Sequence, residues 1–329
     1  MNSYQPRKKM RALPAILLAT LFSVSACVST TPIIYEDGRI DIVFCQEENC
    51  EEKIITELKK ARDIRCAFYD TGLENLTKTL IEKNAEVLIF RENDDEAPNS
   101  WTRVKSSGLM HNKYCVLDKK ITITGSMNPT YNGVNRNDNN ILFIESPRIA
   151  HNYLTEWYEL KKRSGQQTTG VTELVLDLGD RNVTLENYFC PEDKCEKKVL
   201  EELSAAQKNI YFMTFSFTSD PIGALLIQKH MEGIAVQGVF ESRQNDRYSE
   251  YPKLLEAGVN VRKDGNPYTM HHKVFIIDSD TENATVITGS YNPTKAGTTI
   301  NDENMLIIHD HIIAQEFLGE YERIWEETK

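Results

Sequence analysis

Hydrophobic and polar positions follow one another along this chain in an order that occurs twice. The segment FCQEENCE at 44–51 recurs as FCPEDKCE at 189–196, and the apolar positions after each copy keep the same offset of 145 residues. In both copies these positions are spaced one, three and three residues apart, which places them on one face of a helix. The matching pairs are Ile54 and Val199, Ile55 and Leu200, Leu58 and Leu203, and Ala61 and Ala206.

The rest of each copy alternates short apolar runs with amphipathic segments. This rhythm predicts an α/β fold with parallel strand pairing, built from two tandem repeats. The predicted strands are 64–69, 86–90, 210–217 and 235–240, and the predicted helices are 73–83 and 222–232. The second copy is longer before its polar motif, and the additional residues predict a helix at 251–257 and a strand at 259–262.

The first 26 residues have a different pattern, with four basic residues, no acidic residue and an apolar stretch from 12 to about 24. This stretch is too short and too poorly flanked to span a bilayer, so it predicts a secretory signal peptide. It ends in VSAC at 24–27, which resembles the lipobox of bacterial lipoproteins, where the peptide is cut before a cysteine that is then lipidated. We expect an exported protein held by a lipid on Cys27 to a membrane facing the periplasm or the cell exterior; an ordinary signal peptide is the alternative.

A stretch of linker composition, SGQQTTG at 164–170, separates the two copies. The predicted organisation is a signal peptide at 1–26, a first domain at 27–163, a linker at 164–172 and a second domain at 173–329. Two copies of one unit usually pack as a pseudo-twofold dimer, so we expect a monomer with an internal pseudo-dimer and a shared site on its axis.

Charge and cysteine content change this picture in two ways. The chain has 38 Lys and Arg against 49 Asp and Glu, and its net charge of −11 falls to −15 without the first 26 residues. This is the wrong sign for a protein that depends on overall attraction to phosphate backbones. Seven cysteines become six once Cys27 is lipidated, and an even number in an exported protein predicts disulfides.

The expected disulfides are Cys45–Cys50 and Cys190–Cys195, each local to the corner where a strand meets a helix. The alternative is a zinc site made of the same four cysteines, which the long spacers make less favourable. Cys66 and Cys115 lie in predicted strands, and the sequence leaves open whether they are buried thiols or a third disulfide.

One polar pattern occurs in both copies. HNKYCVLD at 111–118 is followed by GSMN at 125–128, and HHKVFIID at 271–278 is followed by GSYN at 289–292. Alternate residues of a strand share a face, so the histidine and the lysine of each copy point the same way. Two structural histidines beside surface lysines would not explain this repetition, and the pattern indicates catalytic roles for His111, Lys113, His271 and Lys273.

This pattern resembles the paired HKD motifs of the phospholipase D superfamily of phosphodiesterases, over about residues 40–160 and 185–327. The second copy, with MTFSFT at 213–218 and NDEN at 301–304, is most similar to the bacterial endonuclease and cardiolipin-hydrolase branch. The resemblance implies two mixed β-sheets flanked by helices, with one active site at their junction and no metal or other cofactor. It also implies a phosphohistidine formed on one histidine and hydrolysed with the other histidine as base.

The residue types suit that chemistry. Metal-free cleavage of a phosphodiester needs a nucleophile, an acid for the leaving oxygen, and cations that hold the phosphoryl oxygens. Imidazoles can fill the first two roles near neutral pH, and the two lysines supply the positive charge. Side chains that can hydrogen-bond at or near the same phosphate are Asn128, Asn292, Ser126 and Ser290.

Glu303 makes the two copies unequal. It lies thirteen residues after Ser290, where the family often has an acid that orients a catalytic histidine, whereas Asn139 takes that place after Ser126. A carboxylate makes an imidazole a better nucleophile, while an amide only orients it. By resemblance to monomeric two-motif members, we expect His111 to be the nucleophile and His271 the acid. This requires Glu303 to reach His111 across the pseudo-twofold axis; if it serves its own half, the roles exchange.

Other residues near the motifs are expected to have structural roles. Strand parity points Asp118 and Asp278 away from the phosphate, so we expect them to support turns. His272 points away from the face shared by His271 and Lys273, and we expect it in the core. Aromatic residues that flank the motifs, and that either pack there or line a cleft, are Trp101, Tyr131, Tyr268 and Tyr291.

The sequence favours a phospholipid as substrate, because a lipid anchor would hold the site beside a bilayer. A nuclease acting on DNA or RNA is the alternative, motivated by the branch that the second copy resembles. Along the sequence there is no arginine-rich or aromatic-interleaved basic tract, which weighs mildly against it. An inactive binding module is a third hypothesis, disfavoured because both motifs keep their histidine, lysine and asparagine.

Overall fold

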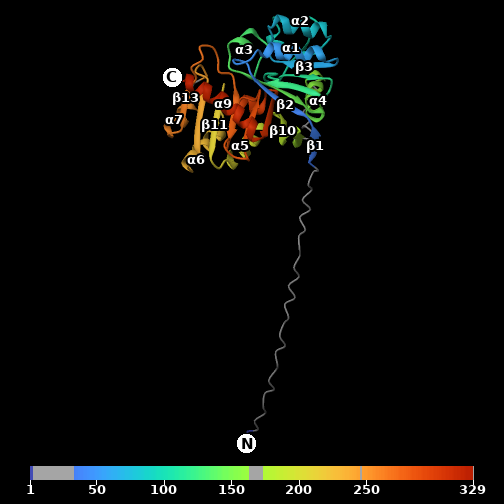
Figure 1. Ribbon diagram of the computed structural model, residues 1–329. Helices are drawn as coiled ribbons and strands as arrows, with labels where there is room; N and C mark the ends of the chain where they lie inside the picture. Colours follow the sequence, from blue (N-terminus) through green and yellow to red (C-terminus); the bar gives the residue numbers. More distant parts are fainter. Residues whose placement is uncertain (3–32, 163–172, 245–246, 329) are drawn as a thin grey trace. The chain divides into compact units, whose positions relative to one another are not determined.

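The computed structural model describes residues 1–2, 33–162, 173–244 and 247–328, and the fold is that of the compact unit that begins at Ile33 (Figure 1). The predicted signal peptide beyond its first two residues, the predicted lipidation site Cys27 and the predicted linker at 164–172 lie outside the described residues. Within the described ranges, no helix has the length and apolar character needed to cross a membrane.

The first repeat forms a seven-stranded mixed sheet in the order β2-β8-β7-β6-β3-β4-β5. β3 pairs in parallel with β4 and antiparallel with β6, the strand that carries the first HKD lysine. In chain order the elements are β2 (Arg39–Phe44), α1 (Cys50–Lys60), β3 (Ile64–Phe68), α2 (Glu74–Glu82), β4 (Glu86–Phe90), a 3₁₀ turn (Arg91–Asn93), β5 (Thr102–Val104), β6 (Lys113–Leu117), β7 (Ile121–Gly125), α3 (Tyr131–Asn135), β8 (Asn140–Glu145) and α4 (Pro147–Lys162).

The second repeat forms a nine-stranded sheet in the order β1-β9-β10-β16-β15-β14-β11-β12-β13. Its elements are β9 (Glu173–Asp177), β10 (Asn182–Cys190), α5 (Cys195–Ala205), β11 (Asn209–Thr214), α6 (Asp220–Met231), β12 (Ala235–Phe240), α7 (Tyr251–Glu256), β13 (Asn260–Lys263), β14 (Lys273–Ile277), β15 (Thr285–Gly289), α8 (Lys295–Thr299), β16 (Glu303–His309) and α9 (His311–Glu327). The predicted strands and helices are confirmed, including α7 and β13 in the longer second copy.

One strand departs from the predicted organisation. β1 (Ile34–Asp37) precedes the first repeat, but it pairs in parallel with β9 and so extends the sheet of the second repeat. The repeat pattern does not predict this pairing of β1 with β9, because β1 lies before the duplicated segment. The two repeats are therefore linked by a strand as well as by packing.

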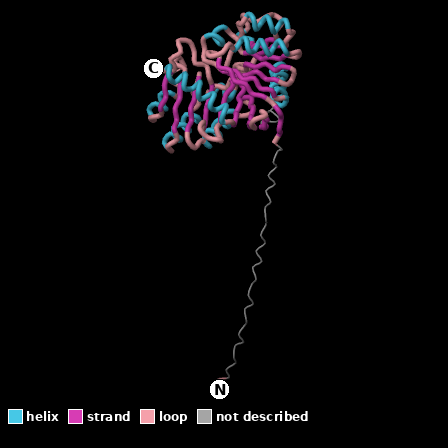
Figure 2. The backbone as a smooth tube through the Cα atoms, viewed as in Figure 1, coloured by secondary structure: helices cyan, strands magenta, loops and turns pink. Residues whose placement is uncertain are grey.

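A central hydrophobic cluster holds the repeats together. It contains inward-facing residues of both sheets together with one face of α4 and one face of α9. Figure 2 traces the strands of the sheets in magenta and the helices beside them in cyan. Ring contacts cross between the repeats: Phe44 meets Phe317 with centroids 5.3 Å apart, and Tyr153 meets Phe189 at 5.0 Å. The opposite faces of the sheets pack against α1 and α2 in the first repeat and against α5, α6 and α7 in the second.

All six cysteines of the described residues are paired. Cys45–Cys50 and Cys190–Cys195 form the two predicted local disulfides, which leaves no thiolate for the alternative zinc site. Cys66 and Cys115 form a third disulfide between β3 and β6, where they are direct register partners. The corresponding partners in the second repeat are Phe212 and Phe275, whose ring centroids lie 5.9 Å apart.

Candidate active site

Each HKD strand is held at its start by the opposite repeat. The backbone N–H of His111 donates to the carbonyl of Asp302 at 2.9 Å, and that of His271 donates to the carbonyl of Asp138 at 2.9 Å. Isolated parallel bridges join Met110 to Asp302 and Met270 to Asp138 at the same places. The two histidines therefore enter the junction between the sheets from opposite sides, where the sequence predicts a shared site.

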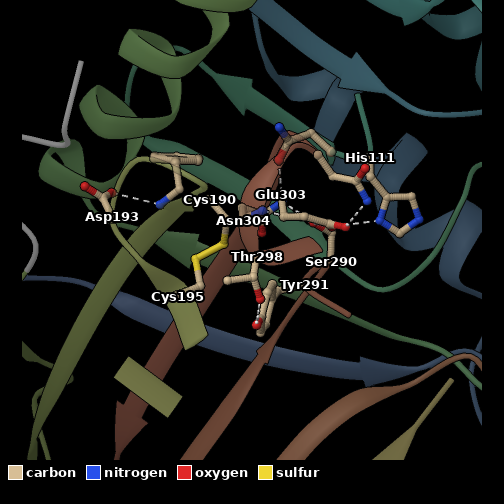
Figure 3. Close-up of a disulfide and its surroundings, with 12 residues drawn as sticks. His111, Cys190, Asp193, Cys195, Ser290, Tyr291, Thr298, Glu303 and Asn304 are labelled. Atoms are coloured by element: carbon tan, nitrogen blue, oxygen red, sulfur yellow. Dashed lines mark hydrogen bonds and ion pairs between the residues drawn. A yellow bond between two sulfur atoms is a disulfide. The ribbon is translucent and has the colours of Figure 1, made fainter. Parts of the chain in front are cut away.

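Glu303 reaches across this junction to His111. Its Oε2 lies 2.7 Å from Nδ1 of His111, and Figure 3 shows the imidazole directed at this carboxylate. Ser290 donates its hydroxyl proton to the same oxygen at 2.8 Å, and the Asn301 amide donates to Oε1 at 3.3 Å. The pairing is the one that the assignment of His111 as nucleophile requires.

Asn139 has the equivalent place beside His271. Nδ1 of His271 lies 2.9 Å from Oδ1 of Asn139, and Ser126 donates to the same oxygen at 2.9 Å. Because the Asn139 amide nitrogen donates to the carbonyl of Gly133 at 2.8 Å, its oxygen is the atom that faces the imidazole. Nδ1 of His271 therefore carries a proton, and Nε2 is the nitrogen left for chemistry.

The serines act through the partners of the histidines. Each hydroxyl also accepts a backbone N–H, that of Asn140 at 3.1 Å for Ser126 and that of Asn304 at 2.9 Å for Ser290. The preceding Gly125 and Gly289 have φ of +150° and +138°, and a Cβ there would approach the carbonyl oxygens of Asn140 and Asn304 within 2.4 Å. Glycine is required at both turns because any side chain would clash with the strand that carries the histidine partner.

Both lysines are buried behind their histidines. Lys273 Nζ donates to the carbonyl of His271 at 2.7 Å, and Lys113 Nζ donates to the carbonyl of His111. Each ammonium also lies over an aromatic ring, Lys113 over Tyr69 at 5.0 Å and Lys273 over Phe215 at 4.8 Å.

The same rings contact the histidines edge-on, with centroid distances of 4.9 Å for Tyr69 and His111 and 4.7 Å for Phe215 and His271. Sequence reasoning missed this aromatic pair. A signal was available, because both residues directly follow the strand that pairs with an HKD strand in their own repeat.

Burial without a bound anion changes the acid–base character of the site. Burial lowers the pKa of Lys113 to about 7, and burial together with Lys113 lowers the pKa of Lys273 well below its ordinary value. Burial, reinforced by the two lysines, lowers the pKa of His111 and His271. Burial raises the pKa of Glu303 to about 7. A phosphodiester entering the site would bring the negative charge that restores both ammonium groups.

The remaining residues that the sequence singles out lie away from the two catalytic imidazoles or follow the turns beside them. Asp118 accepts from the backbone N–H groups of Arg62 and Asp63, and Asp278 from those of residues 207–209, so both support turns away from the histidines. His272 is fully buried between Asn140 and Glu320. Asn128 and Asn292 follow the Gly-Ser turns, and their contact with a phosphate stays a prediction.

A further group of ligand-type side chains lies at the other end of β16 from Glu303. Glu186, Glu202 and His309 place one potential ligand atom each within 4.8 Å of the others. His309 already hydrogen-bonds Glu186 at 2.9 Å and the Thr285 hydroxyl at 2.9 Å. This group lies outside the site formed by the HKD strands and contributes no residue to it.

Comparison with known proteins identifies the duplicated unit. Residues 40–160 and 199–325 each match the family described as "Cardiolipin synthase, PLD-like domain". A protein named phospholipase D from Rickettsia typhi is 32% identical over 143 residues, which are 43% of this chain and 67% of the relative. The human protein named mitochondrial cardiolipin hydrolase is 35% identical over 131 residues, which are 40% of this chain and 50% of the relative. The matches thus span from half to about two thirds of these relatives.

Solved structures extend the comparison to the fold. The phosphatidylserine synthase of Haemophilus influenzae aligns over 88% of this chain and 87% of its own length, with a TM-score of 0.67 and 14% identity. At this identity the likeness shows a shared fold. The phospholipase D family member Nuc from Salmonella typhimurium is 30% identical over 45% of this chain and 97% of its own, with a TM-score of 0.41.

Proposed function

The chain belongs to the family of phospholipase D-like domains, and from this premise we propose that it is a metal-independent phosphodiesterase that hydrolyses phospholipids through a phosphohistidine. One arrangement carries the proposal: two buried histidines, each oriented through Nδ1 by a side chain of the opposite repeat, beside two buried lysines. Relatives named phospholipase D and cardiolipin hydrolase support a lipid phosphodiester as substrate.

In the first step, Nε2 of His111 attacks the phosphorus atom. The carboxylate of Glu303 accepts a hydrogen bond from Nδ1–H and stabilises the positive charge that develops on the imidazole. The bond between phosphorus and the leaving oxygen breaks. His271, which the negative charge of the bound phosphodiester helps to protonate at Nε2, gives this proton to the leaving oxygen, so the alcohol leaves neutral. Lys113 and Lys273 stabilise the charge on the non-bridging oxygens, which is the work that a metal ion performs in other phosphodiesterases.

In the second step, water attacks the phosphorus of the phosphohistidine. His271, now neutral, takes a proton from this water while the bond between phosphorus and His111 breaks. Phosphatidic acid is released, and both histidines return to their starting protonation states. His271 can serve first as acid and then as base because its amide partner Asn139 carries no charge that would fix either form.

We further propose that the chain is an exported lipoprotein anchored through Cys27. The support is the sequence alone: a basic segment, an apolar stretch and small residues before a cysteine. A lipid at this position would keep the site close to a membrane and so raise the local concentration of phospholipid. Labelling with a radioactive fatty acid, followed by the same labelling of Cys27→Ser, tests the anchor directly.

The activity is tested with purified protein in EDTA, incubated with vesicles of phosphatidylcholine, phosphatidylglycerol or cardiolipin and, separately, with single- and double-stranded DNA. We expect release of phosphatidic acid from lipid and no cleavage of DNA. His111→Ala is the matched control, since it removes the nucleophile and keeps the fold. Cleavage of DNA without release of phosphatidic acid would replace the proposal with a nuclease, and loss of activity in EDTA would overturn metal independence.

A further inference from the structure

A stacked cluster of three side chains lies beside His271, and we call Tyr131, Arg136 and Tyr268 the rim cluster. The guanidinium carbon of Arg136 is 5.1 Å from the ring centre of Tyr131 and 4.7 Å from that of Tyr268. Tyr131 and Arg136 come from the first repeat and Tyr268 from the second, so the cluster forms only in the folded pseudo-dimer. Tyr131 is 58% exposed and Tyr268 is 42% exposed, which leaves the outer faces of both rings open to a ligand.

Hydrogen bonds through Asn266 and Asp138 connect the rim cluster to the backbone of His271. Asn266 donates through its amide to the carbonyl of Arg136 at 3.1 Å and to the carboxylate of Asp138 at 2.7 Å. Asp138 in turn accepts the backbone N–H of His271 at 2.9 Å and is buried. The cluster therefore has a defined position relative to the reacting atoms, as a substrate subsite requires.

The positive charge of the Arg136 guanidinium is available to bind an anionic ligand. Among the residues that the structure describes, it makes no ion pair, and its side chain donates a hydrogen bond from Nη1 to Asn132 Oδ1 at 3.1 Å. The guanidinium contacts two aromatic rings and is not neutralised by a carboxylate of the described residues, so its remaining N–H groups can bind oxygens of a phosphate. A cationic ligand such as a choline group would instead be repelled.

The equivalent flank, beside His111, has none of these side chains. Ile300 stands in the place of Arg136, and it is 46% exposed. Lys295 replaces Tyr131 as the first residue of its helix, α8 instead of α3. Gly108 replaces Tyr268, and a Cβ at this glycine would lie 2.5 Å from Asn301 Oδ1 and 2.9 Å from the carbonyl of Ile300. The rim cluster cannot form on this side, so the two flanks contact different parts of a substrate.

We propose that the rim cluster binds a second phosphate, carried by the leaving alcohol, and so selects phospholipids whose headgroup is itself a phosphodiester. This inference rests on the proposed function, in which His271 protonates the leaving oxygen and the leaving group therefore lies on its side. The apolar Ile300 flank then faces the phosphatidyl group retained on His111. Cardiolipin has this structure, whereas phosphatidylglycerol has the same headgroup alcohol without the second phosphate.

The test compares kcat/KM on phosphatidylcholine vesicles that contain either cardiolipin or phosphatidylglycerol at equal surface charge, using the full chain. Arg136→Gln should lower the ratio of cardiolipin to phosphatidylglycerol turnover about tenfold, the usual effect of losing a charge-assisted hydrogen bond. Arg136→Lys keeps the charge but loses the stacked plane and should give an intermediate ratio. Lys295→Gln removes a cation from the opposite flank and should keep the wild-type ratio.

The outcomes separate this inference from the function on which it rests. An unchanged ratio in Arg136→Gln, or an equal loss in Lys295→Gln, would overturn the rim cluster as a phosphate subsite while leaving lipid hydrolysis in place. Release of phosphatidic acid from none of these lipids, phosphatidylcholine included, would overturn the proposed function, and the inference with it. If a single-stranded oligonucleotide were then cleaved and Arg136→Gln reduced that cleavage, the second phosphate would be that of a nucleic acid.

Discussion

The centres of the two repeats share one frame and differ in a single functional group. Glu303 and Asn139 occupy equivalent places, each accepts a hydrogen bond from a serine, and each contacts Nδ1 of the histidine in the other repeat. One side chain is a carboxylate with a pKa raised to about 7 by burial, and the other is an uncharged amide. The two histidines are therefore held in the same geometry by different partners, one an acid and the other an uncharged amide.

The two repeats also differ in the partners of a buried glutamate, Glu320 in the second repeat and Glu156 in the first. In the second repeat, Glu320 binds His272 at 2.9 Å and Arg323, which also reaches Asp138 at 2.7 Å in the other repeat. Burial opposes ionisation of Glu320, but the hydrogen bonds from Arg323 and His272 lower its pKa. The equivalent Glu156 faces Asn112 at 3.4 Å, and burial with nearby acids raises its pKa well above the ordinary value. In the second repeat, the buried Glu320 is thus held by an ion pair with Arg323 as well as by His272. In the first repeat, the buried Glu156 is held by a hydrogen bond from Asn112.

The largest effect should separate the two histidines. His111→Ala removes the nucleophile and should reduce hydrolysis about 10⁴-fold or more for every substrate. His271→Ala removes the acid and base, so with bis(p-nitrophenyl) phosphate, whose leaving group needs no proton, the first step should survive. We expect a stoichiometric burst of p-nitrophenol and a trapped phosphohistidine in His271→Ala, detected after rapid quenching at alkaline pH. A burst in His111→Ala instead would exchange the two roles.

Glu303→Gln should have the next largest effect. The amide keeps the hydrogen bond to Nδ1 but cannot stabilise the imidazolium, so kcat should fall about 10³-fold with KM little changed. Asn139→Asp makes the converse change beside His271 and is the matched variant. It should reduce kcat far less, because His271 still exchanges a proton. Equal losses in the two variants, measured by steady-state kinetics, would contradict the unequal roles.

The disulfides allow a comparison of stability within the first repeat, between the long-range pair that only this repeat has and a local pair of the kind present in both repeats. Cys66–Cys115 joins residues 49 apart in the sequence, and its removal by a double alanine substitution should lower the free energy of unfolding by about 4 kcal/mol in the chain-entropy picture. Cys45–Cys50 joins residues only five apart, and the same treatment should cost about 2 kcal/mol. Urea denaturation under non-reducing conditions measures both. If the short-range pair proved the more important, loop closure would not be the main contribution.

Much of the fold was accessible because the duplication provides an internal check. A strand, helix or motif that occurs at the same offset in both copies is supported twice, which is why β3, α2, β11 and the HKD strands are where the sequence places them. The cross-axis contact of Glu303 followed from its spacing after Ser290 together with the family resemblance. Features present in one copy only lack this support, and β1 and the Cys66–Cys115 pair depend on strand partners that the sequence does not specify.

The rim cluster illustrates the limit of sequence reasoning on this site. Tyr131 and Tyr268 were recognised as flanking the motifs, but nothing connected them with Arg136 or with each other. They are far apart in the chain and have no counterparts in the repeat pattern, since Lys295 and Gly108 replace them. The sequence contains no continuous basic and aromatic tract, whereas the structure assembles a basic and aromatic cluster from the two repeats. Only the packing of the halves brings these side chains together.

The smallest expected effect is the pH dependence of kcat/KM, which reports ionisations of the free enzyme. Lys113 is protonated below its pKa of about 7 and attracts the anionic substrate, so activity should fall by up to about tenfold per pH unit above that value. Glu303 must be ionised to assist His111, so activity should also fall below its pKa of about 7. The result is a bell-shaped profile centred near neutrality.

Two variants assign the limbs of this profile. Glu303→Gln should abolish the acidic limb and keep the alkaline one, because Gln does not titrate. Lys113→Arg should move the alkaline limb to higher pH, because a guanidinium keeps its charge when buried. Asn139→Asp introduces a new titrating group beside His271 and should add to the profile without removing either limb. An acidic limb that persisted in Glu303→Gln would mean that a group other than Glu303 must lose a proton for activity, which would contradict the role assigned to this carboxylate.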